Sequence, residues 1–141
     1  MKVIVLALLI TLASCATPYQ QSGYRGGFSE SPIAQDTYEV NFQGNGYTGQ
    51  QLVRDYLKRR CAELTIEMGH THYIVLGGNS TLDTSLASYN GNYQIVNKPG
   101  ATAIIRLTSN PPADVLAYDA YMVIGKRNPA SEATLKQILD E

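Results

Sequence analysis

The side chains of this chain that are best suited to nucleophilic or metal chemistry belong to two cysteines and two histidines. A thiolate is both a nucleophile and a metal ligand, and a neutral imidazole is a general base and the commonest metal ligand. The cysteines are Cys15 and Cys61, and the histidines are His70 and His72. The sequence around each of them decides whether a chemical or a structural role is expected.

The two histidines are two residues apart in a segment that predicts a strand, so their side chains are expected on one face of it. A His-x-His pair can begin a zinc or copper site, but such a site needs a third or fourth ligand. No spacing indicates one, although Asp36, Glu39 or Asp119 could approach through the fold. We therefore predict no metal site. His70 and His72 are the only candidate metal ligands that the sequence suggests. The other interpretation is that they are a solvent-exposed pair at the start of a strand.

Cys61 lies in a segment with helical periodicity, with Leu57 and Leu64 near it on the apolar side. A cysteine in such a stripe behaves as a small buried hydrophobe. The alternative is a reactive or intermolecular thiol, whose pKa the adjacent Arg60 could lower if both side chains were exposed. The apolar stripe favours burial.

Cys15 follows a segment typical of a secretory signal. Met1-Lys2 is a short positive start, and Val3–Leu12 is an apolar run. As a helix this run would be about 15 Å long, whereas the hydrocarbon core of a bilayer is roughly 30 Å thick. A short apolar run after a positive start indicates a signal peptide that is removed from the mature chain. We therefore predict a signal peptide over residues 1–14.

The sequence Leu12-Ala13-Ser14-Cys15 resembles the lipobox of bacterial lipoproteins. The resemblance implies cleavage before Cys15 and covalent attachment of diacylglycerol and an N-acyl chain there, with no other cofactor. Two or three acyl chains suffice for lasting membrane attachment. Ala16 stands where an aspartate signals inner-membrane retention in enteric lipoproteins, so the resemblance favours the outer membrane.

Composition and motifs exclude several classes of function. The 141 residues include 12 acids and 11 bases, a net charge of −1, so nucleic acid is not an expected partner. The length fits one domain. The sequence contains no Gly-x-Ser-x-Gly, Walker or dinucleotide-binding motif. We therefore predict no catalytic residue and a protein that is not an enzyme.

The most strongly periodic element is a helix over about residues 49–68. Its apolar stripe runs from Leu52 to Met68, Thr48 and Gln51 have capping-box spacing, and Gly69 is placed to end it. Lys58-Arg59-Arg60 predicts a solvated face, while Arg60, Glu63 and Glu67 lie near one edge of the stripe and could form a boundary set of ion pairs.

Short strands are expected on both sides of this helix. Asn90-Gly91 between two tyrosines is typical of a hairpin turn, and residues 79–91 are otherwise polar. The order predicts an α+β fold, a mostly antiparallel sheet with the helix packed on one face. The expected strands are 38–42, 70–76, 93–96, 102–108 and 115–124, and a short C-terminal helix is expected over 131–139.

Residues 15–36 are rich in Gly, Pro and Ser and predict a lipidated N-terminus and tether. Tyr19, Tyr24 and Phe28 are unusual in a linker and could instead dock the segment on the domain. The α+β domain is expected over 37–128, followed by a tail or short helix over 129–141.

The helix and its flanks resemble a family of small lipoproteins of Gram-negative bacteria. The resemblance covers about residues 12–69. It implies an envelope location and a shared fold, but it transfers no activity. The residues that carry it are Thr17-Pro18-Tyr19-Gln20, Gly26-Gly27-Phe28-Ser29-Glu30, Tyr38, Val40, Phe42, Gly44-Asn45, Thr48, Tyr56-Leu57, Arg60, Ala62-Glu63-Leu64-Thr65 and Gly69.

Together these features predict a membrane-anchored envelope lipoprotein whose domain faces the periplasm and acts as a structural or protein-interaction module. The expected partners are the membrane, through the lipid, and another envelope protein or a second copy. One alternative is a small-ligand or metal-binding module, which would use the two histidines or a pocket between helix and sheet. A further alternative is an envelope hydrolase, since catalytic triads can assemble without sequence motifs.

Overall fold

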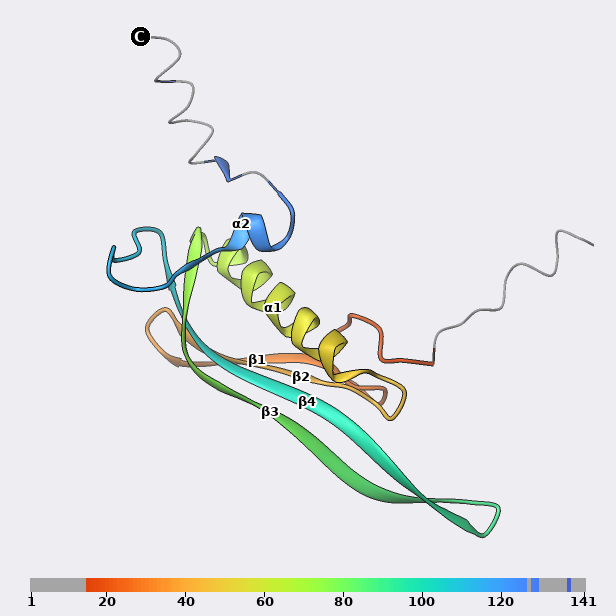
Figure 1. The fold of residues 1–141 in the computed structure, drawn as a ribbon. Coiled ribbons are helices and arrows are strands. Elements are labelled where there is room, and N and C mark those ends of the chain that lie inside the picture. The colour runs from red at the N-terminus through yellow and green to blue at the C-terminus, as the bar shows by residue number, and fades with distance from the viewer. Residues whose placement is uncertain (1–14, 127, 130–136, 138–141) are drawn as a thin grey trace, which may run out of the picture.

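The computed structural model describes residues 15–126, 128, 129 and 137. Within them the chain forms one antiparallel sheet of five strands in the order β1-β2-β4-β3-β5, with one long helix packed across one face (Figure 1). The predicted α+β class is confirmed. In chain order the elements are β1 (Gly27–Ala34), β2 (Thr37–Gln43), α1 (Gln50–Glu67), β3 (His72–Tyr89), β4 (Asn92–Thr108), β5 (Tyr118–Asp119) and α2 (Ala120–Val123).

Helix α1 ends as its sequence predicts. Gly69 has a φ of +82°, which a residue with a side chain rarely adopts. The backbone N–H groups of Gly69 and His70 donate back to carbonyls of the last helical turn, in the pattern of a Schellman motif. The predicted glycine terminator is confirmed.

The start of α1 differs from the predicted capping box. Gly49 is the N-cap residue, and no side chain of the described residues caps the helix. The hydroxyl of Thr48 instead accepts a hydrogen bond from the backbone N–H of Thr17, 2.9 Å away. The Thr48 hydroxyl, which local spacing assigned to the helix cap, is therefore hydrogen-bonded to a residue far away in the sequence.

The core lies between α1 and the sheet. At about 100° per residue, helical periodicity puts Ala62 on the polar side of α1 and Met68 on the apolar stripe, but Ala62 is fully buried and Met68 is exposed. Because α2 and the N-terminal segment also pack against α1, the helix buries more than one stripe. The buried apolar residues of the core are Val40, Phe42, Val53, Leu57, Cys61, Ala62, Leu64, Tyr73, Ala101, Ala103, Ile105, Leu107 and Ala120.

The N-terminal segment is folded onto the domain and does not form the expected tether. Strand β1 pairs with β2 from Gly27, opposite Gln43, to Ala34, opposite Thr37. Thr17 is buried, and its hydroxyl donates to the carbonyl of Arg25. The folded unit therefore begins well before residue 37, where composition alone placed its boundary.

Strands β3 and β4 form a hairpin that is far longer than the separate short strands expected. Its turn lies at Asn90-Gly91, as predicted, and the φ angles of 50° and 79° fit type I′. Residues 79–89 of the polar stretch and residues 98–100, which lie between two expected strands, are all within the ladder. Gly77-Gly78 does not end the strand but follows a bulge. Because β2 stops at Gln43, opposite Gly100, residues 82–99 project beyond the sheet as a two-stranded arm (Figure 1).

The segment expected to be the longest strand, residues 115–124, contains only the short β5 followed by α2. Asp119 ends the strand because its carboxylate accepts hydrogen bonds from the N–H groups of Tyr121 and Met122 and so caps α2. Gly125, with a φ of +71°, follows the helix. The helix expected over 131–139 lies outside the described residues except for residue 137.

Candidate functional site

The structure separates the two histidines. His70 lies in the connection before β3, and only His72 is in the strand, so the expectation of one shared strand face is wrong. His70 Nε2 is 3.5 Å from Asp36 Oδ1, and His72 Nε2 is 3.9 Å from Asp119 Oδ2. Each histidine thus has its own carboxylate. Among the described residues no group of three or more His, Cys, Asp or Glu side chains is placed to hold a metal ion.

Cys61 is buried in the core, as its position on the apolar stripe predicts. Burial raises the pKa of its thiol to about 12, because the thiolate would be poorly solvated there. The nearby charge of Arg60 lowers the pKa but does not offset burial. At neutral pH Cys61 is therefore a protonated, shielded thiol rather than a nucleophile.

The most extensive polar cluster surrounds Arg60, on the side of α1 that faces the N-terminal segment. The Arg60 guanidinium is 2.8 Å from a carboxylate oxygen of Glu67 and 2.8 Å from one of Glu30. Burial opposes its positive charge, but the hydrogen bonds with Glu67 and Glu30 outweigh burial and raise the pKa of Arg60. The predicted ion pair within the helix is confirmed, and Glu30 of β1 is an additional partner.

Aromatic residues complete the same cluster. The Tyr19 hydroxyl donates a hydrogen bond to Glu63. The guanidinium of Arg59 lies 4.1 Å above the Tyr19 ring, and that of Arg60 lies 4.6 Å above Phe28. Desolvation favours the neutral form of Glu63, but the hydrogen bonds from Tyr19 and Arg59 outweigh it and lower the pKa of the carboxyl. The cluster fastens the N-terminal segment to α1, which is a structural role.

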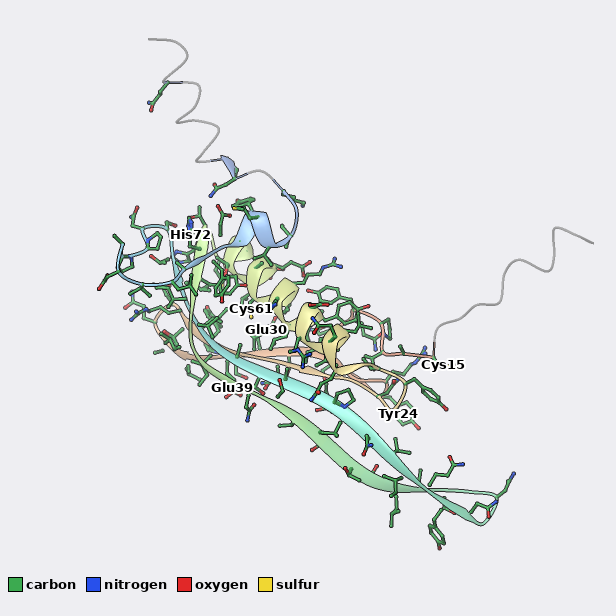
Figure 2. The ribbon with its side chains drawn as sticks, viewed as in Figure 1. Cys15, Tyr24, Glu30, Glu39, Cys61 and His72 are labelled. Atoms are coloured by element: carbon green, nitrogen blue, oxygen red, sulfur yellow. The ribbon has the colours of Figure 1, made fainter. Side chains whose placement is uncertain are left out.

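Cys15 lies at the start of this fastened segment and is exposed. The side-chain amide of Asn45 donates to its backbone carbonyl at 2.9 Å, and Thr17 is already buried. Figure 2 shows Cys15 and Tyr24 at the end of the domain from which the arm projects, and His72 at the opposite end. Of the three N-terminal aromatic residues, Tyr19 and Phe28 dock on the domain, whereas Tyr24 is fully exposed.

A hollow of about 660 Å³ joins Cys15 to the arm. Cys15, Arg25 and Tyr47 line one side of it, and Ile95 and Lys98 of β4 line the other. None of the described residues that line the hollow is acidic. The hollow therefore combines apolar and aromatic surface with two positive charges.

One face of the arm is apolar and exposed. Directly opposed residues of an antiparallel pair share a face, so Leu86 and Ile95 lie side by side, as do Ser88 and Tyr93. Leu86 is 72% exposed, Tyr93 76% and Ile95 69%. Scattered exposed hydrophobes are ordinary, but a row of them along one projecting ribbon marks a contact surface.

A second hollow lies between α1 and β3. It measures about 560 Å³, and Val75, Gly78 and Ala101 form its sheet side. Leu57, Arg54 and Lys58 of α1 form the other side. This groove leads onto the arm, because Gly78 and Leu82 lie on the same face of β3.

Among the described residues, no helix is both long and apolar enough to cross a membrane. Comparison of the chain with protein-family models, with curated proteins and with solved structures found no match.

Sequence reasoning missed the arm, and it raised a pocket between helix and sheet without naming the residues that form it. The arm could have been predicted from the Asn90-Gly91 turn, because the residues on both sides of that turn can form strands. Polar residues, Gly77-Gly78 and Pro99 obscured this signal. The groove depends on how far α1 covers the sheet, and no local pattern encodes that.

Proposed function

We propose that this chain is a lipid-anchored protein of the bacterial cell envelope. In this proposal residues 1–14 are removed and Cys15 carries the lipid. The membrane is the outer membrane, and the α+β domain faces the periplasm. The domain acts as a structural or interaction module rather than as an enzyme.

The observation that carries the proposal is Cys15 itself. It ends a lipobox-like segment, and it is exposed where the described fold begins. Asn45 contacts its carbonyl, and Thr17 is buried two residues further on. A lipid at this residue would hold the domain directly against the bilayer, because almost no linker separates the two. The domain would then present its surfaces to a partner in a restricted orientation.

The experiment compares the intact mass and membrane fractionation of the wild-type chain with those of Cys15→Ser. We expect the wild type to gain the mass of acyl groups and to sediment with membranes. The Cys15→Ser variant should lack that mass. Cys61→Ala is the matched control, since it removes the other thiol and should leave acylation unchanged.

A soluble, unacylated wild-type chain would contradict the proposal. If acylation is found, crosslinking in the membrane fraction distinguishes the two expected protein partners. A band at twice the mass of the chain indicates a second copy, and a different mass indicates another envelope protein.

The groove between α1 and β3 favours a second candidate function, the binding of a small ligand. Its volume of about 560 Å³ falls in the range of small-molecule sites, roughly 300–1,000 Å³. Arg54 and Lys58 at its edge would favour an anionic ligand. Native mass spectrometry of protein purified from its host tests this, since a retained anionic molecule should be lost in a Lys58→Glu variant, which reverses an exposed charge at the edge of the groove.

A further inference from the structure

The arm projects from the same end of the domain that carries Cys15 (Figure 2). The two are joined by the 660 Å³ hollow, which Cys15 and Ile95 both line. If the proposed function holds and Cys15 is acylated, the lipid holds this hollow and the adjoining arm at the bilayer surface. A tether of nearly zero length makes the local concentration of lipid far higher than that of any diffusing protein.

We propose that the arm docks on the membrane surface, with its apolar face against the lipid beside the Cys15 anchor. This inference rests on the proposed function for the anchor, but it assigns a separate binding surface. The surface consists of the apolar face of the arm, namely Leu82, Leu86, Tyr93 and Ile95, and of the exposed tyrosines at the Cys15 end, Tyr24 and Tyr47.

The chemistry of this surface suits the interfacial region of a bilayer. Tyrosine is enriched there because its ring is apolar and its hydroxyl remains hydrated. Tyr24, Tyr47 and Tyr93 are all strongly exposed. Leucine and isoleucine on the same face of the arm supply the apolar area that drives interfacial binding.

The charges at the Cys15 end of the domain are also compatible with docking on a membrane surface. The arm has one acid and one base, Asp83 and Lys98, which lie directly opposite each other in the ladder. The arm itself is therefore neutral, and Arg25, which lines the hollow, adds one positive charge that suits anionic headgroups. The carboxylates of Asp36 and Asp119 lie with the histidines, near the start of β3 and far from the turn of the arm.

The chain contains no tryptophan, so a single introduced indole reports on one site. Tyr93→Trp places it on the arm. Leu116→Trp places it at an equally exposed position, 74% for Leu116, in the loop between β4 and β5. Each acylated protein is reconstituted in vesicles of phosphatidylethanolamine with a minority of phosphatidylglycerol. We expect the indole of Tyr93→Trp to shift to shorter wavelength and to be quenched by brominated acyl chains, while that of Leu116→Trp remains unquenched.

A second measurement separates the arm from the anchor. The mature chain, residues 15–141 with Cys15→Ser, contains all of the described fold and no lipid. We expect it to bind the same vesicles weakly. Leu86→Glu should reduce that binding by about tenfold or more, because a charge replaces a leucine that docking would bury in the lipid. Leu116→Glu, at a matched exposure, should leave binding unchanged.

The outcomes for the anchor and for the arm are distinguishable. An acylated protein whose Tyr93→Trp indole stays as exposed as that of Leu116→Trp would overturn the docking of the arm and leave the anchor intact. Crosslinking of the arm to a second copy or to another protein, in place of lipid quenching, would also overturn it. Absence of acyl mass at Cys15 would overturn the proposed function, and vesicle binding that depends on Leu86 would still support the arm.

Discussion

Arg60 joins the N-terminal segment to α1 through ion pairs. Its side chain is nearly buried and reaches carboxylates of both β1 and α1. A buried ion pair stabilises a fold little more than well-packed apolar residues would. Removing only one partner is costly, however, because the other charge stays buried without an opposite charge beside it. The neighbouring Arg59 makes an ion pair too, with Glu63, but its side chain is 54% exposed. The two adjacent arginines are therefore expected to contribute differently to the free energy of unfolding.

This difference predicts unequal effects of two matched substitutions. We expect Arg60→Gln to lower the free energy of unfolding by about 2 kcal/mol or more, because charged hydrogen bonds in a nearly buried site are lost. Arg59→Gln should cost about 1 kcal/mol or less. Chemical denaturation of both variants and the wild type measures the two values. Equal effects would show that burial of Arg60 does not govern the strength of the cluster.

Cys61 gives a second prediction at the scale of single residues. Because burial raises the pKa of its thiol to about 12, neither access nor ionisation favours reaction at neutral pH. A thiol reagent should label Cys61 in the mature chain only after denaturation. The Cys61→Ala variant gives the background. Rapid labelling of the native chain would contradict the burial described for this side chain.

At the scale of elements, β3 shows how glycines permit a close approach between strands. A Cβ added at Gly78 would lie 2.4 Å from the carbonyl oxygen of Thr102, a backbone atom that cannot easily move. No described atom lies within 4 Å of a Cβ added at Gly77. Gly78 is therefore required where β3 passes close to β4 just after the bulge, and Gly77 is not.

The matched substitutions Gly78→Ala and Gly77→Ala test this. We expect Gly78→Ala to destabilise the fold by about 1–3 kcal/mol, as overpacking does. Gly77→Ala should change stability by roughly 0.5 kcal/mol or less, as at ordinary surface positions. Thermal or urea unfolding of the two variants provides the comparison. A similar loss in both would indicate that backbone conformation, rather than contact with Thr102, explains the glycines.

At the scale of the whole molecule, the N-terminal segment belongs to the folded unit. Strand β1 covers one edge of the sheet, and Tyr19 and Phe28 join the aromatic cluster against α1. A protein cut at residue 37 would lose this strand and expose the paired edge of β2. Segments with such packing resist proteases, because cleavage needs local unfolding.

Limited proteolysis of the mature chain should therefore leave residues 16–36 attached to the domain. A chain that begins at residue 37 should unfold at a lower temperature than one that begins at residue 15. N-terminal sequencing of the protected fragment and circular dichroism of both chains measure these outcomes. Release of a stable domain that begins near Asp36 would restore the tether interpretation.

The sequence by itself determined the features that depend on neighbours along the chain. The bounds of α1, its Gly69 terminator, the Asn90-Gly91 turn and the burial of Cys61 follow from local periodicity and backbone preference. The α+β class follows from the order of these elements. The lipobox-like segment before Cys15 is likewise local, and it remains a prediction for the acylation experiment.

Only the tertiary structure decided the features that depend on distant partners. Glu30 reaches Arg60 across 30 positions of sequence, so a segment that reads as a tether becomes strand β1. Asp36, in the turn between β1 and β2, faces His70, whereas Asp119 of β5 faces His72, so the fold brings a different carboxylate to each histidine. The polar residues of the arm form strands because each ladder partner supplies hydrogen bonds that composition does not reveal. The packed fold also places Ile95 of the arm and Cys15 beside the same hollow. Local sequence determines each element but not which elements become its neighbours.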